Sequence, residues 1–256
     1  MNVRTMVVAV LCATACLVPG FVVSRDTAAA DEVETARQLV ALLQLSHALV
    51  SEHQAEINDP AKGDKGFTPD FVGETLTTRF RNQERIDLSR PDGTSQGALL
   101  RSLLESQKEV VASYQTVINR PGIGFKGFLP TLFARKACEQ FFEKTGIKLK
   151  LTGTDYRFQG NKPDDFETEI LRMFADSRHP KGQSYGRNML VAGKPALRLI
   201  QPEYAVASCL SCHGGPKGER DITGMRKEGW KEGELAGAIS VTMPLVDRPP
   251  VAVFRR

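Results

Sequence analysis

One short motif limits what this chain can fold into and carry. The pentad Cys209-Leu210-Ser211-Cys212-His213 has the pattern Cys-x-x-Cys-His, which is the attachment signature of a c-type haem. Two thiols three positions apart can reach the two vinyl groups on one edge of a porphyrin, and the adjacent imidazole can bind the iron as its proximal ligand. The sequence therefore predicts one covalently attached haem c, held by Cys209 and Cys212, with His213 as a metal ligand.

Three other interpretations of the pentad remain open. A structural zinc site needs about four ligands, usually including a second Cys-x-x-Cys or a His pair, and the remaining candidates are scattered singly: Cys138, His47, His53 and His179. A disulfide between Cys209 and Cys212 leaves the following histidine unexplained. A thioredoxin-like dithiol normally opens a helix early in a βαβ unit, whereas this pentad lies late and is followed by Gly214-Gly215-Pro216. Haem attachment explains all three functional residues.

Haem is attached to such pentads on the oxidising side of a bacterial membrane, so the motif requires export. The N-terminus has a positive residue, Arg4, then an apolar run over 6–18, and Ala28-Ala29-Ala30 offers a cleavage site. We therefore predict a signal peptide over residues 1–30 and a periplasmic product with no stable membrane insertion. The apolar stretch is close to the length of a membrane span, so an uncleaved N-terminal anchor stays open.

The charge balance excludes one class of partner. The chain has 34 Lys and Arg against 30 Asp and Glu, a formal net charge of +4, and no basic run. This near balance gives no case for nucleic-acid binding. We expect instead a redox protein, of unknown identity, as the partner.

The hydrophobic pattern predicts an α+β fold, with helices first and a small antiparallel sheet after them. The division that follows is a signal peptide over 1–30, an N-terminal helical region over 31–120 and a haem-binding domain over 121–256. The expected helices cover residues 31–58, 69–80, 96–118, 130–145 and 164–175, and the expected strands cover residues 147–151, 188–191, 196–201 and 235–245. Residues 214–234 are expected to form a solvated, glycine-rich charged loop.

The sequence also contains an internal echo. Lys65-Gly66-Phe67-Thr68-Pro69 parallels Lys126-Gly127-Phe128-Leu129-Pro130, and each segment is followed at the same spacing by a phenylalanine, Phe80 or Phe141. We interpret this as one type of loop-to-helix junction used twice, with Phe as a packing anchor and Pro in the first helical turn. Two copies are too few for a repeat protein.

Four segments of residues 124–245 resemble a known family, the haem-binding, PAS-like periplasmic domains first seen in cyanobacterial proteins and also found as sensor regions of histidine kinases. The segments are Gly-Phe-Lys-Gly-Phe-Leu-Pro (124–130), Asn-Lys-Pro-Asp-Asp-Phe-Glu (161–167), Cys-Leu-Ser-Cys-His-Gly (209–214) and Gly-Ala-Ile-Ser-Val-Thr-Met-Pro-Leu (237–245). The resemblance implies a PAS-like, five-stranded antiparallel sheet with a long N-terminal helix across it and a c-type haem between them.

The family resemblance also implies a distal iron ligand on the N-terminal helix, which is a cysteine in the characterised relatives. Residues 31–59 contain no cysteine but do contain His47 and His53. On a helical projection from Leu39, His53 lies about 40° from the apolar direction and His47 about 80° from it. We therefore predict His53 as the second metal ligand, with His47 as the alternative. His179, Cys138, Met189 and Met243 are weaker candidates, expected to be loop or core residues.

Two functions fit this prediction. In the first, the protein is a mono-haem c-type cytochrome-like redox module with both axial positions filled. In the second, it is a haem-based redox or gas sensor that acts through a separate partner. An enzyme such as a peroxidase needs an open distal site with an acid–base residue, and no residue of the sequence points to one, so we expect no enzymatic activity.

Overall fold

The computed structural model of the protein describes residues 25–246. The predicted signal peptide therefore lies largely outside the described residues. The elements, in chain order, are α1 (Arg25–Glu52), α2 (Gln54–Ile57), α3 (Pro69–Glu84), α4 (Ser95–Ile118), α5 (Pro130–Thr145), β1 (Lys148–Thr152), η1 (Gln159–Asn161), α6 (Asp165–Ala175), β2 (Tyr185–Val191), β3 (Lys194–Tyr204), η2 (Ala207–Cys209), α7 (Leu210–His213) and β4 (Leu235–Pro244).

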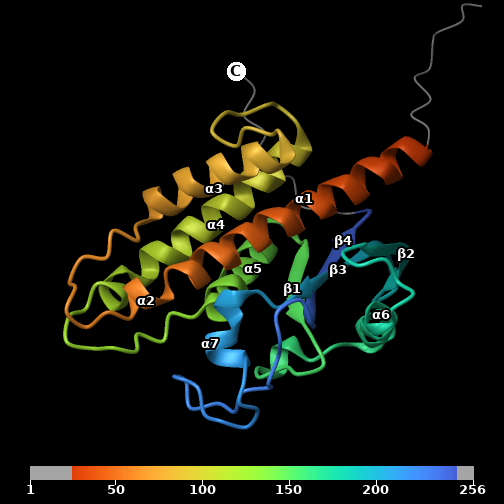
Figure 1. Cartoon of the computed structure of the whole chain (residues 1–256). Helices are drawn as coiled ribbons and strands as arrows, with labels where there is room; N and C mark the ends of the chain where they lie inside the picture. Colours follow the sequence, from red (N-terminus) through yellow and green to blue (C-terminus); the bar gives the residue numbers. More distant parts are fainter. Residues whose placement is uncertain (1–24, 247–256) are drawn as a thin grey trace, which may run out of the picture.

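The predicted α+β class is confirmed, and the elements form three layers (Figure 1). Helices α1, α3, α4 and α5 form a bundle, in which α1 packs on each of the other three. The bundle covers one face of the sheet through α1 and α5, and α6 covers the other face. Helix α1 contacts the bundle and strands β3 and β4, and α5 contacts the bundle and β1, so these two helices join the two halves of the molecule.

The sheet has four strands in the order β1-β4-β3-β2, all antiparallel within the described residues. This corrects the five strands that the family resemblance implied; four strands are also what the residue pattern alone predicted. Strand β4 is central and pairs with β1 through Leu149↔Val241 and with β3 through Leu199↔Val241. Strands β2 and β3 are joined by the tight turn at Ala192 and Gly193, which both have positive φ.

The main hydrophobic core lies between the bundle and the sheet. Its fully buried side chains include Leu39 and Leu43 of α1, Leu100 of α4, Phe133 of α5 and Ile239 of β4. This cluster contains residues from both sides of position 120. The predicted boundary between two regions at that position stays a prediction. A smaller cluster lies between α6 and the opposite face of the sheet, where Phe166 and Ile170 pack on Ile200.

The helix ends follow the local chemistry. Thr68 and Thr94 cap α3 and α4 with their hydroxyl oxygens, and Pro69 stands in the first turn of α3. Helix α5 ends at Gly146, whose φ of 70° is a left-handed conformation that glycine adopts without strain. The predicted long first helix differs from the observed one, because the chain breaks at His53 into α1 and the single turn α2.

The internal echo extends to two whole helix–loop–helix units. Helices α3 and α5 both have 16 residues, and the loops before them exchange equivalent hydrogen bonds. The side chain of Asn58 accepts from the backbone N–H of Lys126 at 3.0 Å, and that of Asn119 accepts from the backbone N–H of Lys65 at 3.1 Å. The prediction of a shared loop-to-helix junction is therefore confirmed, and the two junctions brace each other across an approximate two-fold relation.

A second pair of contacts repeats the same exchange. Gln54 donates from Nε2 to the carbonyl of Phe128 at 2.9 Å, and Gln115 donates to the carbonyl of Phe67 at 2.8 Å. Both phenylalanines are fully buried. Each loop is thus held by a polar side chain from the helix that precedes the other loop, while its aromatic ring fills the core.

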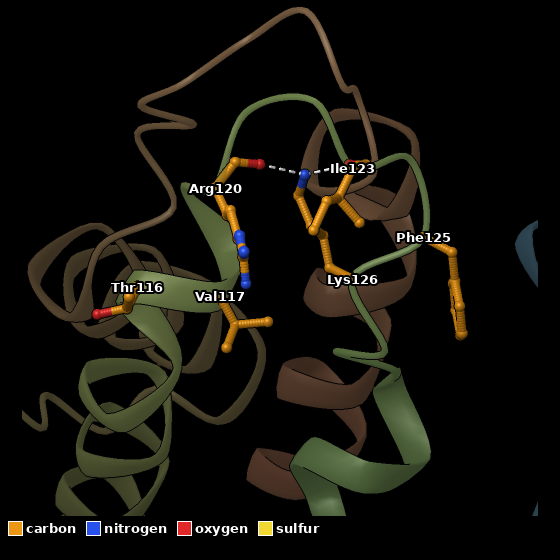
Figure 2. Close-up of a pocket in the computed structure, with 6 residues that line it drawn as sticks. All are labelled: Thr116, Val117, Arg120, Ile123, Phe125 and Lys126. Carbon is orange, nitrogen blue, oxygen red and sulfur yellow. Dashed lines mark hydrogen bonds between the residues drawn. The ribbon is translucent and has the colours of Figure 1, made fainter.

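The two lysines of the echo are buried structural donors. The ammonium of Lys126 donates to the carbonyls of Arg120 and Ile123 (Figure 2), and that of Lys65 donates to the carbonyls of Asp59 and Lys62. Each lysine satisfies backbone oxygens in the turn before its helix. The loop around Lys126 encloses a shallow cavity of about 160 Å³ at the end of α4 (Figure 2), lined by Thr116, Val117, Arg120, Ile123, Phe125 and Lys126.

The reciprocal brace predicts matched effects of two substitutions. Asn58→Ala and Asn119→Ala each remove the acceptor of one sheltered backbone N–H, so each should lower the free energy of unfolding by about 1–3 kcal/mol. Urea unfolding followed by circular dichroism measures this loss, with Asn82→Ala on the exposed face of α3 as the control. A loss confined to one of the two variants would contradict the equivalence of the loops.

Candidate functional site

The pentad folds into a compact helical turn at the start of the last connection in the chain. Cys209 ends η2, and the following residues form α7 up to His213. Cys209 and Cys212 are both half-buried free thiols. The structure therefore does not contain the disulfide that was one alternative interpretation of the pentad. A Cβ at Gly214 would lie 2.5 Å from the carbonyl oxygen of Leu210. Glycine is thus required immediately after the pentad for this turn to close.

The imidazole of His213 is held in one orientation by a carboxylate. Its Nδ1 lies 2.7 Å from Oε2 of Glu228, and because a carboxylate accepts, Nδ1 is the nitrogen that carries the proton. The ring of Trp230 stacks on the imidazole with a centroid distance of 4.4 Å and an angle of 8° between the planes. This leaves Nε2 with its lone pair, the arrangement in which a histidine binds a metal while a carboxylate accepts from its other ring nitrogen.

Arg157 links the carboxylate to the pentad. Its guanidinium donates from Nε and Nη2 to both oxygens of Glu228 at 2.6 and 2.8 Å, from Nη1 to Asp221 at 2.5 Å, and from Nη2 to the carbonyl of Cys212 at 2.9 Å. The side chain of Asp221 is fully buried and that of Glu228 nearly so. Charge-assisted bonds of this kind fix geometry more strongly than neutral ones.

These contacts set the ionisation of the proximal group. Burial lowers the pKa of His213 and the charge of Arg157 lowers it further, against the opposing effect of Glu228. Burial alone would raise the pKa of Glu228, but its bonds to Arg157 and His213 bring that pKa below its ordinary value. At neutral pH the pair is therefore a neutral imidazole that donates to a carboxylate, as a ligating histidine requires.

His47 lies on α1 one helical turn after Gln44, whose side chain reaches β3. The Nε2 of His47 is shielded from solvent and has no hydrogen-bond partner. Burial lowers the pKa of His47 to about 4, and the charge of His213 lowers it in the same direction, so the two imidazoles act on each other. Helix α1 also packs directly on η2. An unpartnered nitrogen in such a place is costly unless it binds something.

His53 is placed differently from its prediction. At the break between α1 and α2, its Nδ1 donates to the carbonyl of Leu49 at 2.9 Å, and its ring packs on Phe67 and Phe71, each at a centroid distance of 5.3 Å. These contacts belong to the helical bundle and not to the side of α1 that meets the pentad. His47 is therefore a better candidate than His53 for the distal ligand. The apolar side of α1, on which the prediction of His53 was based, points to the bundle core.

The weaker candidates have structural surroundings. The ring of His179 packs on Phe174 and donates to the carbonyl of Gln183 at 3.0 Å. Cys138 is buried, and this burial raises the pKa of its thiol to about 12. Met243 is fully buried in the main core, and Met189 packs against the small cluster under α6. The predictions of core packing for Cys138 and the two methionines are confirmed.

A buried acid lies on the same side of α1 as His47. Gln44, one helical turn before His47, donates from Nε2 to Glu203 near the end of β3. Burial raises the pKa of Glu203 to about 7, although the hydrogen bond from Gln44 acts to lower it. Sequence reasoning missed this residue, because a single glutamate in a strand carries no signal of its own.

Residues 25–246 contain neither a ready-made metal cluster nor a membrane-spanning helix. No group of three or more His, Cys, Asp or Glu side chains in this part of the chain is arranged to hold a metal ion by itself. Nor does any helix within the same residues combine the length and apolar character that a membrane crossing needs.

The donor set fits a c-type haem. Two thiols lie one helical turn apart beside an imidazole with a free Nε2, and an orphaned imidazole nitrogen on the packed helix α1 offers a second axial ligand. This set defines a class of protein, the α+β proteins with a Cys-x-x-Cys-His attachment turn beside a long helix.

The comparisons name the family within that class. The model of the Tll0287-like family (Tll0287) matches residues 25–244, and the chain belongs to this family. Among solved structures, the chain is similar to the crystal structure of the cyanobacterial haem protein Tll0287, with 20% identity over 58% of this chain and 91% of that chain and a TM-score of 0.41. A comparison with curated proteins gives no match.

Burial of Glu203 predicts a pH dependence of stability. Because its folded-state pKa is about 7 against an ordinary value of 4.5, the folded protein binds more protons than the unfolded chain between these values. The free energy of unfolding should therefore fall as the pH rises through this window, by at most about 3 kcal/mol.

Glu203→Gln mimics the protonated acid and should remove this fall, so that the variant gains stability over the wild type at about pH 8 but not at about pH 5. Urea unfolding at the two pH values measures the difference, with Glu232→Gln at an exposed carboxyl as the control. Parallel pH profiles of the wild type and Glu203→Gln would contradict the assignment.

Proposed function

We propose that this protein is a periplasmic mono-haem c-type protein with a redox role. Cys209 and Cys212 would attach one haem c covalently, His213 would be its proximal ligand and His47 its distal ligand. The observation that carries the proposal is the presence of two imidazoles that are each arranged to bind iron. His213 has its Nδ1 bound to Glu228, and His47 has a buried Nε2 without a hydrogen-bond partner. The family also includes the cyanobacterial haem protein Tll0287.

The residues around the site would each contribute to such a role. A haem bound here would supply an iron that changes between Fe(III) and Fe(II) by one electron. Glu228 would hold His213 in the tautomer that offers Nε2, and its negative charge would favour the more positive iron state. The stacked ring of Trp230 would keep the imidazole from rotating. Because both axial positions would be filled by side chains, the site suits electron transfer and disfavours catalysis on oxygen or peroxide.

The distal residue would set this chain apart from relatives that use a cysteine thiolate on the same helix. Replacing a thiolate with a neutral imidazole removes a negative charge from the iron. The reduction potential should therefore lie above that of the family's His/Cys members, because ligand identity is one of the main determinants of haem potential. The predicted export signal over residues 1–30 fits the periplasmic location in which such pentads receive their haem.

The alternative function is a haem-based redox or gas sensor that acts through a separate partner. It is favoured by the position of His47 on α1, because this helix also packs on three other helices of the bundle. If the distal ligand left the iron when a gas bound, the link between α1 and the haem through that ligand would be lost. The PAS-like architecture that the sequence resemblance implied belongs to the same hypothesis.

Covalent attachment is tested by expressing the protein with a cytochrome c maturation system. The wild type should keep its haem stain on a denaturing gel, and the Cys209→Ala/Cys212→Ala variant should lose it, because thioether bonds survive denaturation and axial ligation does not. Cys138→Ala is the matched control and should keep the stain. A wild-type protein that loses its haem under these conditions would refute the c-type assignment.

The distal assignment is tested by comparing His47→Ala with His53→Ala. The wild-type haem should be six-coordinate and low-spin, since two imidazoles form a strong field. His47→Ala should become high-spin and bind CO, whereas His53→Ala should keep the wild-type absorption and EPR spectra. The reverse result would return the role to His53, and a wild type that is already high-spin and binds CO would favour the sensor.

A further inference from the structure

The connection after the pentad is largely solvent-exposed, as expected from its sequence, and its backbone folds back on itself as a hairpin. Across residues 217–228, the backbone N–H of Gly218 donates to the carbonyl of Lys227 at 2.9 Å, and that of Lys227 donates to the carbonyl of Glu219 at 2.8 Å. Nearer the tip, the N–H of Asp221 donates to the carbonyl of Met225 at 2.9 Å. The segment extends away from the helical layer and the sheet beside α7 (Figure 1).

This hairpin is fixed to the proximal histidine. The backbone N–H groups of Gly229 and Trp230 both donate to the carbonyl of His213 at 2.9 Å. At the tip, the buried carboxylate of Asp221 accepts from the backbone and hydroxyl of Thr223 and from Arg157. The tip is therefore held in one position relative to the pentad by contacts at both of its ends.

The outer surface of the hairpin combines apolar and cationic side chains. Ile222 is 56% exposed and Met225 is 44% exposed, and the exposed residues Arg220 and Arg226 face each other across the ladder and flank them. Both guanidiniums donate to backbone carbonyls of the hairpin, and among the described residues neither forms an ion pair with a carboxylate.

The acidic residues of the hairpin are already engaged. Asp221 and Glu228 pair with Arg157, and Glu219 pairs with Lys227 at 3.1 Å. The two arginines, together with the exposed Lys217 at the base, therefore give the hairpin an excess of positive charge.

We propose that the hairpin of residues 217–228 is the docking surface for an acidic electron-transfer protein. An apolar centre of Ile222 and Met225 with a cationic rim is the arrangement of a protein interface, and small interfaces of this kind suit brief redox encounters. Complementary charge raises the rate of encounter more than it raises affinity. The proposal rests on the proposed redox function, because the surface is attached to the proximal histidine of that site.

Binding is tested without reference to electron transfer, with poly-L-glutamate as the acidic probe. At low ionic strength it should shift the backbone amide NMR signals of residues 217–228 in the purified protein. Arg220→Glu/Arg226→Glu should abolish these shifts, and the matched charge reversal Arg90→Glu/Arg172→Glu, at exposed positions elsewhere, should leave them in place. Shifts centred on another surface, or no shifts, would overturn the proposal. Anionic phospholipid vesicles that displace poly-L-glutamate from these residues would assign the surface to a membrane instead.

Electron transfer is tested separately with inorganic oxidants of opposite charge. The dithionite-reduced wild type is oxidised either by anionic ferricyanide or by cationic hexaammineruthenium(III). The ratio of the rate with ferricyanide to the rate with hexaammineruthenium(III) should fall as the ionic strength rises. The ratio of the two rates should drop about tenfold in Arg220→Glu/Arg226→Glu and stay unchanged in Arg90→Glu/Arg172→Glu. An unchanged ratio in the first variant would overturn the docking surface. A protein with no reducible haem would instead refute the proposed function, and the binding result would still decide the surface.

Discussion

Burial of helix α1 on two sides is the constraint from which the rest of the structure follows. Leucines of α1, among them Leu39 and Leu43, belong to the core that the bundle and the sheet share, and the helix also contacts η2 next to the pentad. The side of α1 near β3 and η2 carries polar residues as well. There Gln44 bonds to Glu203, and His47 keeps an unpartnered nitrogen. An orphaned buried nitrogen costs about 1–3 kcal/mol, and a ligand-binding role is what would compensate for that cost.

The opposite side of the site is organised by Arg157, which combines stability with positioning. Buried charges are tolerated only when they are paired and fully hydrogen-bonded, and this guanidinium meets that condition with two carboxylates and the carbonyl of Cys212. One side chain therefore connects the residue before His213, the carboxylate behind His213 and the hairpin tip. A substitution at Arg157 would strand two buried carboxylates at once, so we expect its effect on folding to mask its effect on the site.

The sequence could predict the elements but not which face of α1 serves the site. Caps and prolines located the helix ends near Asn58, Asn119 and Gly146. Alternation located the first strand, a turn signal located the hairpin and an apolar run located the last strand, because these signals are local. The prediction of His53 over His47 used the apolar direction of the helix, and this direction points to the largest hydrophobic neighbour of the helix, which here is the bundle. Glu228 and Arg157 were missed, since they lie far apart in the sequence and a charged residue in a loop gives no sign of being buried.

The two helix–loop–helix units separate what supports the fold from what serves the site. Both units keep the asparagine, glutamine, lysine and phenylalanine that brace the loops, so the role of these residues is to hold the loops in place. The position in α4 equivalent to His47 is Lys108, which pairs with Glu105 at 3.1 Å and lies beside Gly73 of α3. The same scaffold thus places a histidine where α1 meets the pentad and an ion-paired lysine where α4 meets α3. The repeated architecture itself therefore does not require a histidine at position 47, which agrees with the proposal that His47 is a haem ligand.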